Sequence, residues 1–235
     1  MYYHSNEYLP DEILNNKEHY SKMLSIVGGS DIALILAGLH KVNELTLCDL
    51  NANQFNVFKS KKEFIENDPF GLNYMLFYYC PNKNDVDYFS RFSKFLPETQ
   101  DFVRNNLEEI VESKEQLYSL FLDDYVEAFS RGNQIYEHLS EGEIKIDFLQ
   151  GDIFDSLSKH YDVVYLSNAL DFISIENLDA VIEKIELLKD DVVIYDSSKH
   201  LSETTVPKLK RYSKQDFASI LFVTYLKSLP YVSFF

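Results

Sequence analysis

The chain has 235 residues, of which 46% are hydrophobic and 15% aromatic, and its formal net charge is -16. A chain of this length and composition is expected to fold as one domain, residues 1–235, with a sizeable core. The strong negative charge repels a polyphosphate backbone and an anionic membrane surface. Nucleic acid is therefore excluded as an expected partner.

The N-terminal segment and the cysteines give information on the cellular compartment of the protein. The opening residues, MYYHSNEYLPDE, lack the basic and apolar regions of a signal peptide. No apolar run reaches the roughly 18 residues that a membrane-spanning helix needs. Cys48 and Cys80 have neither CxxC nor histidine spacing, so they predict no metal site and no disulfide framework. These features predict a cytoplasmic protein without an integral membrane segment, and they leave its oligomeric state open.

The first part of the chain alternates short apolar runs with helical patterns. In order, we expect a helix over about 10–22, a strand over 23–27, a helix over 32–39, a strand over 44–48 and a helix through 55–65. Gly28 and Gly29 break the first strand, and Asp49 ends the second. Asn51 is the expected N-cap of the helix that follows.

The middle of the chain interrupts this alternation. Residues 69–142 carry apolar side chains at helical spacing and predict a helical insertion. Its aromatic residues are expected either to cover an acceptor site, since aromatic faces suit cations, or to form a local core. They include Tyr74, Phe77, Tyr78, Tyr79, Tyr88 and Phe92.

The alternation resumes in the last part of the chain. We expect strands over 144–149, 161–166 and 191–195, a helix over 175–188, and a final pair of antiparallel edge strands over 219–226 and 231–235. Repeated strand–helix–strand units predict an α/β fold, a doubly wound, Rossmann-like and mostly parallel sheet with helices on both faces.

Ligands of such sheets bind beyond the carboxyl ends of the strands, where the strand order reverses. Gly28 and Gly29 would allow a sharp turn and a close approach of the backbone to a ligand. Asp49 follows 21 residues after Gly28, a spacing that suits a carboxylate bound to ribose hydroxyls. Asp152 ends a later strand and could accept a hydrogen bond from an adenine amine. Each feature alone is also typical of an ordinary turn or helix cap, so the prediction depends on their combination.

The loop sequence G-G-S-D-I-A bears on the choice of cofactor. A nicotinamide dinucleotide site would use G-x-G-x-x-G, and Asp31 would repel its pyrophosphate. S-adenosylmethionine has no phosphate and carries a sulfonium and an ammonium, which an acidic loop attracts. The sequence therefore favours S-adenosylmethionine as co-substrate.

Two parts of the chain resemble the BtaA-like family. The first is I-V-G-G-S-D-I-A-L-I-L-A-G together with V-N-E-L-T-L-C-D-L-N-A-N-Q, and the second is Y-D-V-V-Y-L-S-N-A-L-D-F-I-S. Members of that family are S-adenosylmethionine-dependent 3-amino-3-carboxypropyl transferases that make the head group of betaine lipids. The resemblance covers roughly residues 24–66 and 144–196, and D-L-N-x-x-Q is its most specific part. It implies the class I S-adenosylmethionine-dependent methyltransferase fold.

The resemblance also implies a reaction and a binding site. The aminocarboxypropyl group would pass to a lipid or to a small-molecule acceptor, such as an amine of the kind used by nicotianamine-synthase-like enzymes, and 5′-methylthioadenosine would leave. The segment Ser167-Asn168 would border the reacting centre. The residues expected at the cofactor are Gly28, Gly29, Ser30, Asp31, Asp49, Leu50, Gln54, Asp152, Ile153, Ser167 and Asn168.

No catalytic residue stands out, because substitution at carbon needs positioning more than acid–base help. Asp171, Tyr165, Asn168 and His200 are candidates for orienting or deprotonating the acceptor. Asp171 could instead begin the helix at Ile175, Tyr165 could lie in the core, and His200 could be solvated. Two other functions stay open: methyl transfer on the same fold, and a non-catalytic cofactor-binding or partner protein.

Overall fold

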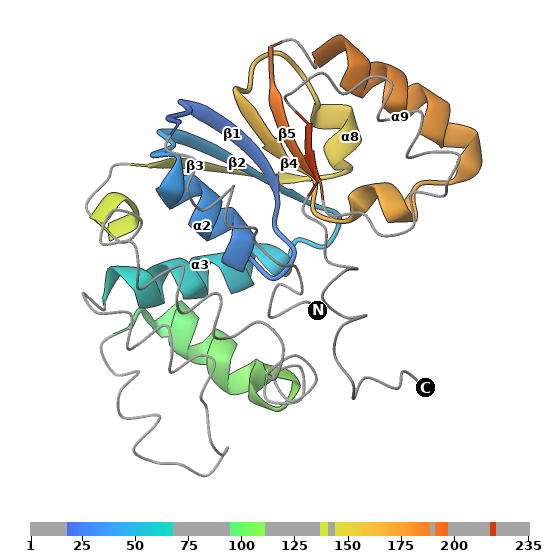
Figure 1. Cartoon of the computed structure of the whole chain (residues 1–235). Helices are drawn as coiled ribbons and strands as arrows, with labels where there is room; N and C mark the ends of the chain where they lie inside the picture. Colours follow the sequence, from blue (N-terminus) through green and yellow to red (C-terminus); the bar gives the residue numbers. More distant parts are fainter. Residues whose placement is uncertain are drawn as a thin grey trace, which may run out of the picture.

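The computed structural model describes residues 18–67, 95–110, 137–140, 144–188, 191–196 and 217–219. A parallel sheet with helices on both faces dominates this part of the chain (Figure 1). The strand order is β3-β2-β1-β4-β5-β6, and each of the five strand pairings is parallel. The α/β architecture expected from the sequence is thereby confirmed.

The strands are short and mostly apolar. In chain order they are β1 (Lys22–Ile26), β2 (Glu44–Asp49), β3 (Lys145–Gln150), β4 (Val163–Tyr165), β5 (Val193–Asp196) and β6 (Phe217–Ser219). The register places Ile26 beside Cys48 and Ser25 beside Tyr165, so β1 lies between β2 and β4. The strand order therefore reverses at β1, which makes the crevice beside it the expected binding position in a sheet of this kind.

The helices connect the strands and cover both faces of the sheet. They are α2 (Asp31–Leu39), α3 (Gln54–Glu66), α8 (Ile153–Ser156), the 3-10 helix η2 (Ala169–Phe172) and α9 (Ile175–Leu188). Two further helical segments, 97–110 and 137–140, belong to the expected insertion. The rest of the insertion, with the aromatic residues named above, lies outside the described residues.

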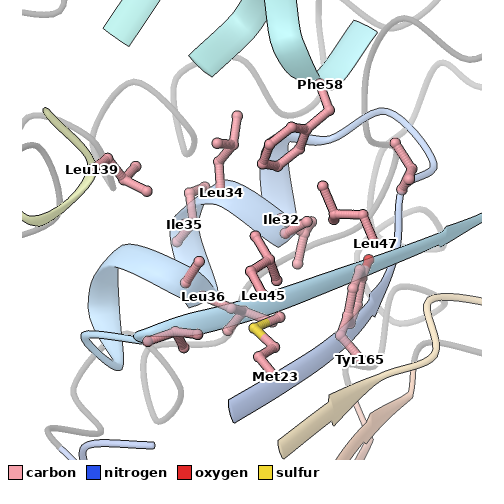
Figure 2. Packing of buried hydrophobic residues seen from close by; sticks show 14 of the residues in the cluster. Met23, Ile32, Leu34, Ile35, Leu36, Leu45, Leu47, Phe58, Leu139 and Tyr165 are labelled. Carbon is pink, nitrogen blue, oxygen red and sulfur yellow. The ribbon is translucent and has the colours of Figure 1, made fainter. Parts of the chain in front are cut away.

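Alternate side chains of the strands feed two separate cores. Met23 on β1 and Val163 and Tyr165 on β4 pack with α2 and α3 on one face (Figure 2). Leu24 and Val164, one residue away, pack with α8 and α9 on the other face. This period of two is the geometry of a strand that is buried on both sides. Both faces of the central strands β1 and β4 are thus covered, which leaves their carboxyl ends as the place for a ligand.

Several predicted boundaries were wrong. Helix α3 begins at Gln54 with Asn53 as N-cap, because Asn51 Oδ1 accepts a hydrogen bond from the Asn53 amide at 3.1 Å and closes a turn first. A helix was expected over 10–22, but residues 18–22 are not helical, and Lys22 begins β1. Residues 10–17 lie outside the described residues.

The described part of the C-terminal edge is a single short strand. The described edge strand, β6, pairs parallel with β5, and Asp196 lies opposite Ser219. Apart from Ser219, the predicted strands over 219–226 and 231–235 lie outside the described residues.

Candidate functional site

Most of the expected site residues lie at one edge of the sheet. Gly28–Ser30 follow β1, Asp49 and Leu50 end and follow β2, Asp152 follows β3, and Ser167 and Asn168 follow β4. Because these strands are adjacent and parallel, their carboxyl ends meet at the same edge. The fold therefore brings together residues from four separate parts of the chain.

Asp49 is the best positioned carboxylate of this edge. Its Oδ2 accepts a hydrogen bond from the Gly28 amide at 3.4 Å, and its Oδ1 accepts one from the Asn51 amide at 2.9 Å. Burial raises the pKa of Asp49 above its usual value, and these two amides oppose that rise. Each oxygen still has a lone pair for a further donor, since a carboxylate offers about four acceptor positions. The half-buried group can thus accept two hydroxyls of a ribose.

The turn after β1 requires an unusual backbone. Gly28 has a φ of +46°, which side chains rarely tolerate, although an added Cβ would meet its first neighbour, Ile26 Cγ2, only at 3.8 Å. Glycine is therefore needed here for conformation and not for space. Ser30 follows with a φ of 72° as the N-cap of α2, and its buried hydroxyl has no hydrogen-bond partner among the described residues.

Asp31 lies in a different environment from the one the sequence suggested. Its carboxylate is fully buried and accepts from Lys61 Nζ at 2.7 Å, and the same ammonium group donates to the Gly29 carbonyl at 2.6 Å. Burial lowers the pKa of Lys61, and the neighbouring Asp31 opposes that shift. The pair is neutral as a whole, so Asp31 does not make the loop acidic towards a ligand.

Gln54 and Leu50 follow β2 and take different positions. Gln54 is buried, and its side-chain amide donates to the Gly28 carbonyl. Leu50 is 74% exposed, an unusual position for a large apolar side chain. Gln54 thus supports the glycine turn from behind, while Leu50 offers an apolar surface next to Asp49.

Asp152 caps a helix as well as ending a strand. Its Oδ1 accepts from the Phe154 amide at 2.9 Å, which makes it the N-cap of α8, while Ile153 is buried. The side chain is nevertheless exposed at the carboxyl edge. The capping contact is the ordinary structural role for such a residue, and it leaves the second oxygen of the carboxylate for a ligand.

The segment after β4 contains the candidate catalytic residues. Ser167 is buried with a φ of 54°, and its hydroxyl lies 3.4 Å from Asn168 Oδ1. Asp171 is half-buried within η2, and the Ser174 carbonyl accepts from the first turn of α9, so Asp171 does not begin that helix. Tyr165 is only 2% exposed and belongs to the core (Figure 2). Asn168 and Asp171 therefore remain as candidates, while His200 lies outside the described residues.

Three buried polar residues were missed by the sequence analysis. Lys61 holds the glycine turn, as described above. Glu63 accepts from the Leu96 amide at 2.5 Å and from the Thr99 hydroxyl, at the start of helix 97–110. His40 Nδ1 lies 2.9 Å from the Glu18 carbonyl, and its Nε2 lies 3.1 Å from the Tyr195 hydroxyl. Lysine and glutamate on a helix usually face solvent, so no pattern in the sequence marked the first two.

Comparisons with known proteins give no family for this chain. It matches no family model, and a search of curated proteins finds no match. Within the described residues, no helix has both the length and the apolar character needed to cross a membrane. The same part of the chain contains no cluster of three or more metal-ligating side chains. The function must therefore be argued from the geometry of the carboxyl edge.

Proposed function

We propose that the chain is an S-adenosylmethionine-dependent transferase that moves the 3-amino-3-carboxypropyl group to a small-molecule or lipid acceptor. The observation that carries the proposal is the Asp49 carboxylate, held against the Gly28 amide at the point where the strand order reverses. The residues that suggested the BtaA-like family supply this contact, which supports membership of that family and its class I fold.

The cofactor would lie along the edge from β4 to β3. Asp49 would accept the two ribose hydroxyls, and Leu50 would cover one face of the adenine. The free oxygen of Asp152 would accept from the adenine amine, and the Ile153 amide, at the first position of α8, would lie beside the ring. Gly29 and Ser30 would line the methionine end of the cofactor.

The charges of the edge support a cationic ligand over a dinucleotide. The segments 28–31, 49–53, 151–153 and 167–172 contain no lysine or arginine. A pyrophosphate bound there would find no side-chain cation to balance it, and Lys61 is already engaged by Asp31. Exposed or half-buried carboxylates at Asp49, Asp152 and Asp171 would instead attract a sulfonium and an ammonium.

The chemistry is a substitution at the carbon next to sulfur. A nitrogen or oxygen of the acceptor attacks the Cγ of the aminocarboxypropyl arm, the S–Cγ bond breaks, and 5′-methylthioadenosine leaves with the electron pair. The acceptor loses a proton, for which Asp171 is the candidate base and Asn168 a candidate orienting group. In-line positioning supplies most of the acceleration in such a reaction.

The test of the reaction is chromatography of the nucleoside product. Incubation of the protein with S-adenosylmethionine and either diacylglycerol micelles or primary amines should release 5′-methylthioadenosine. Release of S-adenosylhomocysteine would show methyl transfer instead. Calorimetry that detects no binding of S-adenosylmethionine at millimolar concentration would contradict the proposal.

Variants test the site itself. Asp49→Ala should weaken cofactor binding by about 100-fold, because two hydroxyl contacts to a charged acceptor are lost. Asp101→Asn, at an exposed carboxylate on helix 97–110, is the matched control and should bind normally. Asp152→Ser keeps an N-cap for α8 but removes the carboxylate, so weaker binding at unchanged stability would assign Asp152 to the adenine.

A further inference from the structure

Helix α3 supports the glycine turn with two buried side chains. Gln54 and Lys61 are separated by two helical turns and therefore lie on the same side of α3. Gln54 donates to the Gly28 carbonyl, and Lys61 donates to the Gly29 carbonyl at 2.6 Å. Two consecutive carbonyl groups of the turn are thus bound to one helix.

This arrangement fixes where the amide groups of the turn point. In a planar trans peptide the N–H of one residue points opposite to the carbonyl of the residue before it. The Gly29 and Ser30 amides are therefore directed away from α3. The Ser30 amide donates to the Val27 carbonyl at 2.7 Å, which agrees with this orientation. The Gly29 amide also faces away from α3. It follows the Gly28 amide, which donates to the Asp49 carboxylate.

A buried ion pair is a poor way to stabilise a fold. Removing two charges from water costs about as much as their attraction returns, and apolar residues of similar volume are often as good. Lys61 and Asp31 are both fully buried, so the pair bears the full desolvation cost. Lys61, however, supplies what an apolar residue cannot, because its ammonium group binds the Gly29 carbonyl and Asp31 together.

We infer that Lys61 is a positioning residue for the cofactor. It fixes the peptide group formed by the Gly29 carbonyl and the Ser30 amide, and Asp31 holds Lys61 in place. Gln54 fixes the preceding peptide group, whose Gly29 amide faces the bound S-adenosylmethionine. The inference rests on the proposed function for the identity of the ligand. The orientation of the turn itself does not depend on the ligand, which allows the two to be tested separately.

The decisive variant is the double substitution Asp31→Asn/Lys61→Met, which removes both buried charges and releases the Gly29 carbonyl. It should bind S-adenosylmethionine about tenfold more weakly by calorimetry, a loss equal to one hydrogen bond. Asp31→Asn alone leaves an acceptor for Lys61 and should bind within about threefold of the unmodified protein. Lys62→Met, at the exposed pair with Glu66, is the matched control and should bind normally.

Two outcomes would overturn the inference. Normal binding by the double variant would show that the contact with Gly29 is not needed. An equal loss in Asp31→Asn and in the double variant would assign the effect to the charge of Asp31. Gln54→Leu, which releases the neighbouring Gly28 carbonyl, gives an independent version of the test and should also weaken binding.

Amide hydrogen exchange in the ligand-free protein separates the inference from the proposed function. The Ser30 amide should exchange at least tenfold faster in the double variant, because its bond to Val27 loses support, whereas the Leu47 amide in the sheet should not change. Unchanged exchange at Ser30 would contradict the positioning role. If the unmodified protein binds no S-adenosylmethionine but Ser30 responds as expected, the proposed function fails and the role of Lys61 stands.

Discussion

The turns after β1 and β4 lie at the same edge of the sheet but are held in different ways. Each contains a serine with a positive φ, Ser30 at 72° and Ser167 at 54°. The turn after β1 is bound by buried side chains of α3. The turn after β4 is closed by local backbone contacts, such as the hydrogen bond from the Ala169 amide to the Leu166 carbonyl at 3.1 Å.

This difference indicates that the cofactor side of the edge, after β1, and the acceptor side, after β4, are preorganised to different degrees. Long-range contacts from α3 fix the cofactor side before any ligand arrives, which lowers the entropy cost of binding. The acceptor side depends on neighbouring backbone groups, and its exposed Phe172, at 74%, packs little against the core. We expect the cofactor side to be the more rigid of the two.

The largest expected effect on the free energy of unfolding comes from removing the side chain that packs α3 against the core. Phe58 is 1% exposed and packs α3 against α2 and β2 (Figure 2). Phe58→Ala should lower the free energy of unfolding by about 3–5 kcal/mol, measured by urea denaturation. Phe172→Ala, at an exposed site, should change it by less than about 0.5 kcal/mol. A similar loss in both variants would contradict the comparison.

A smaller effect is expected from the two serines with positive φ. Ser30→Gly and Ser167→Gly should each raise the free energy of unfolding by up to about 1 kcal/mol, because a side chain in the left-handed region costs about 1–2 kcal/mol and glycine entropy offsets part of it. Lys41→Gly, at a φ of 50° outside both turns, is the control. A loss of stability at Ser30 alone would show that its hydroxyl has a structural role.

The smallest effect on the free energy of unfolding at neutral pH is expected from His40, which links the end of α2 to β5 through Tyr195. Burial lowers the pKa of His40 below 6.5. The unfolded chain therefore binds more protons than the folded chain between that lowered pKa and 6.5, and the free energy of unfolding falls as the pH falls through this window. Urea midpoints at a series of pH values should show the decline, and His40→Gln should remove it. An identical decline in the variant would assign it to other groups.

The sequence predicted the sheet better than the support of the site. Apolar runs such as Leu45–Cys48 marked the strands because strands buried on both faces need them, and Asp49 was marked by its distance from Gly28. The partnership of Lys61 with Asp31 could not be predicted, because it joins residues 30 positions apart on two helices. The sequence therefore suggested that Asp31 faces the ligand, whereas its carboxylate is buried against Lys61.

Glu63 gives α3 a second connection, since its carboxylate holds the start of helix 97–110 while Lys61 holds the glycine turn (Figure 1). Two elements from separate parts of the chain thus depend on one helix. Thermodynamic linkage is reciprocal: if one ligand raises the affinity for another through α3, the second raises the affinity for the first by the same factor. Cofactor binding is then expected to protect the amides of helix 97–110, and an acceptor that orders this helix is expected to tighten the hold on the cofactor.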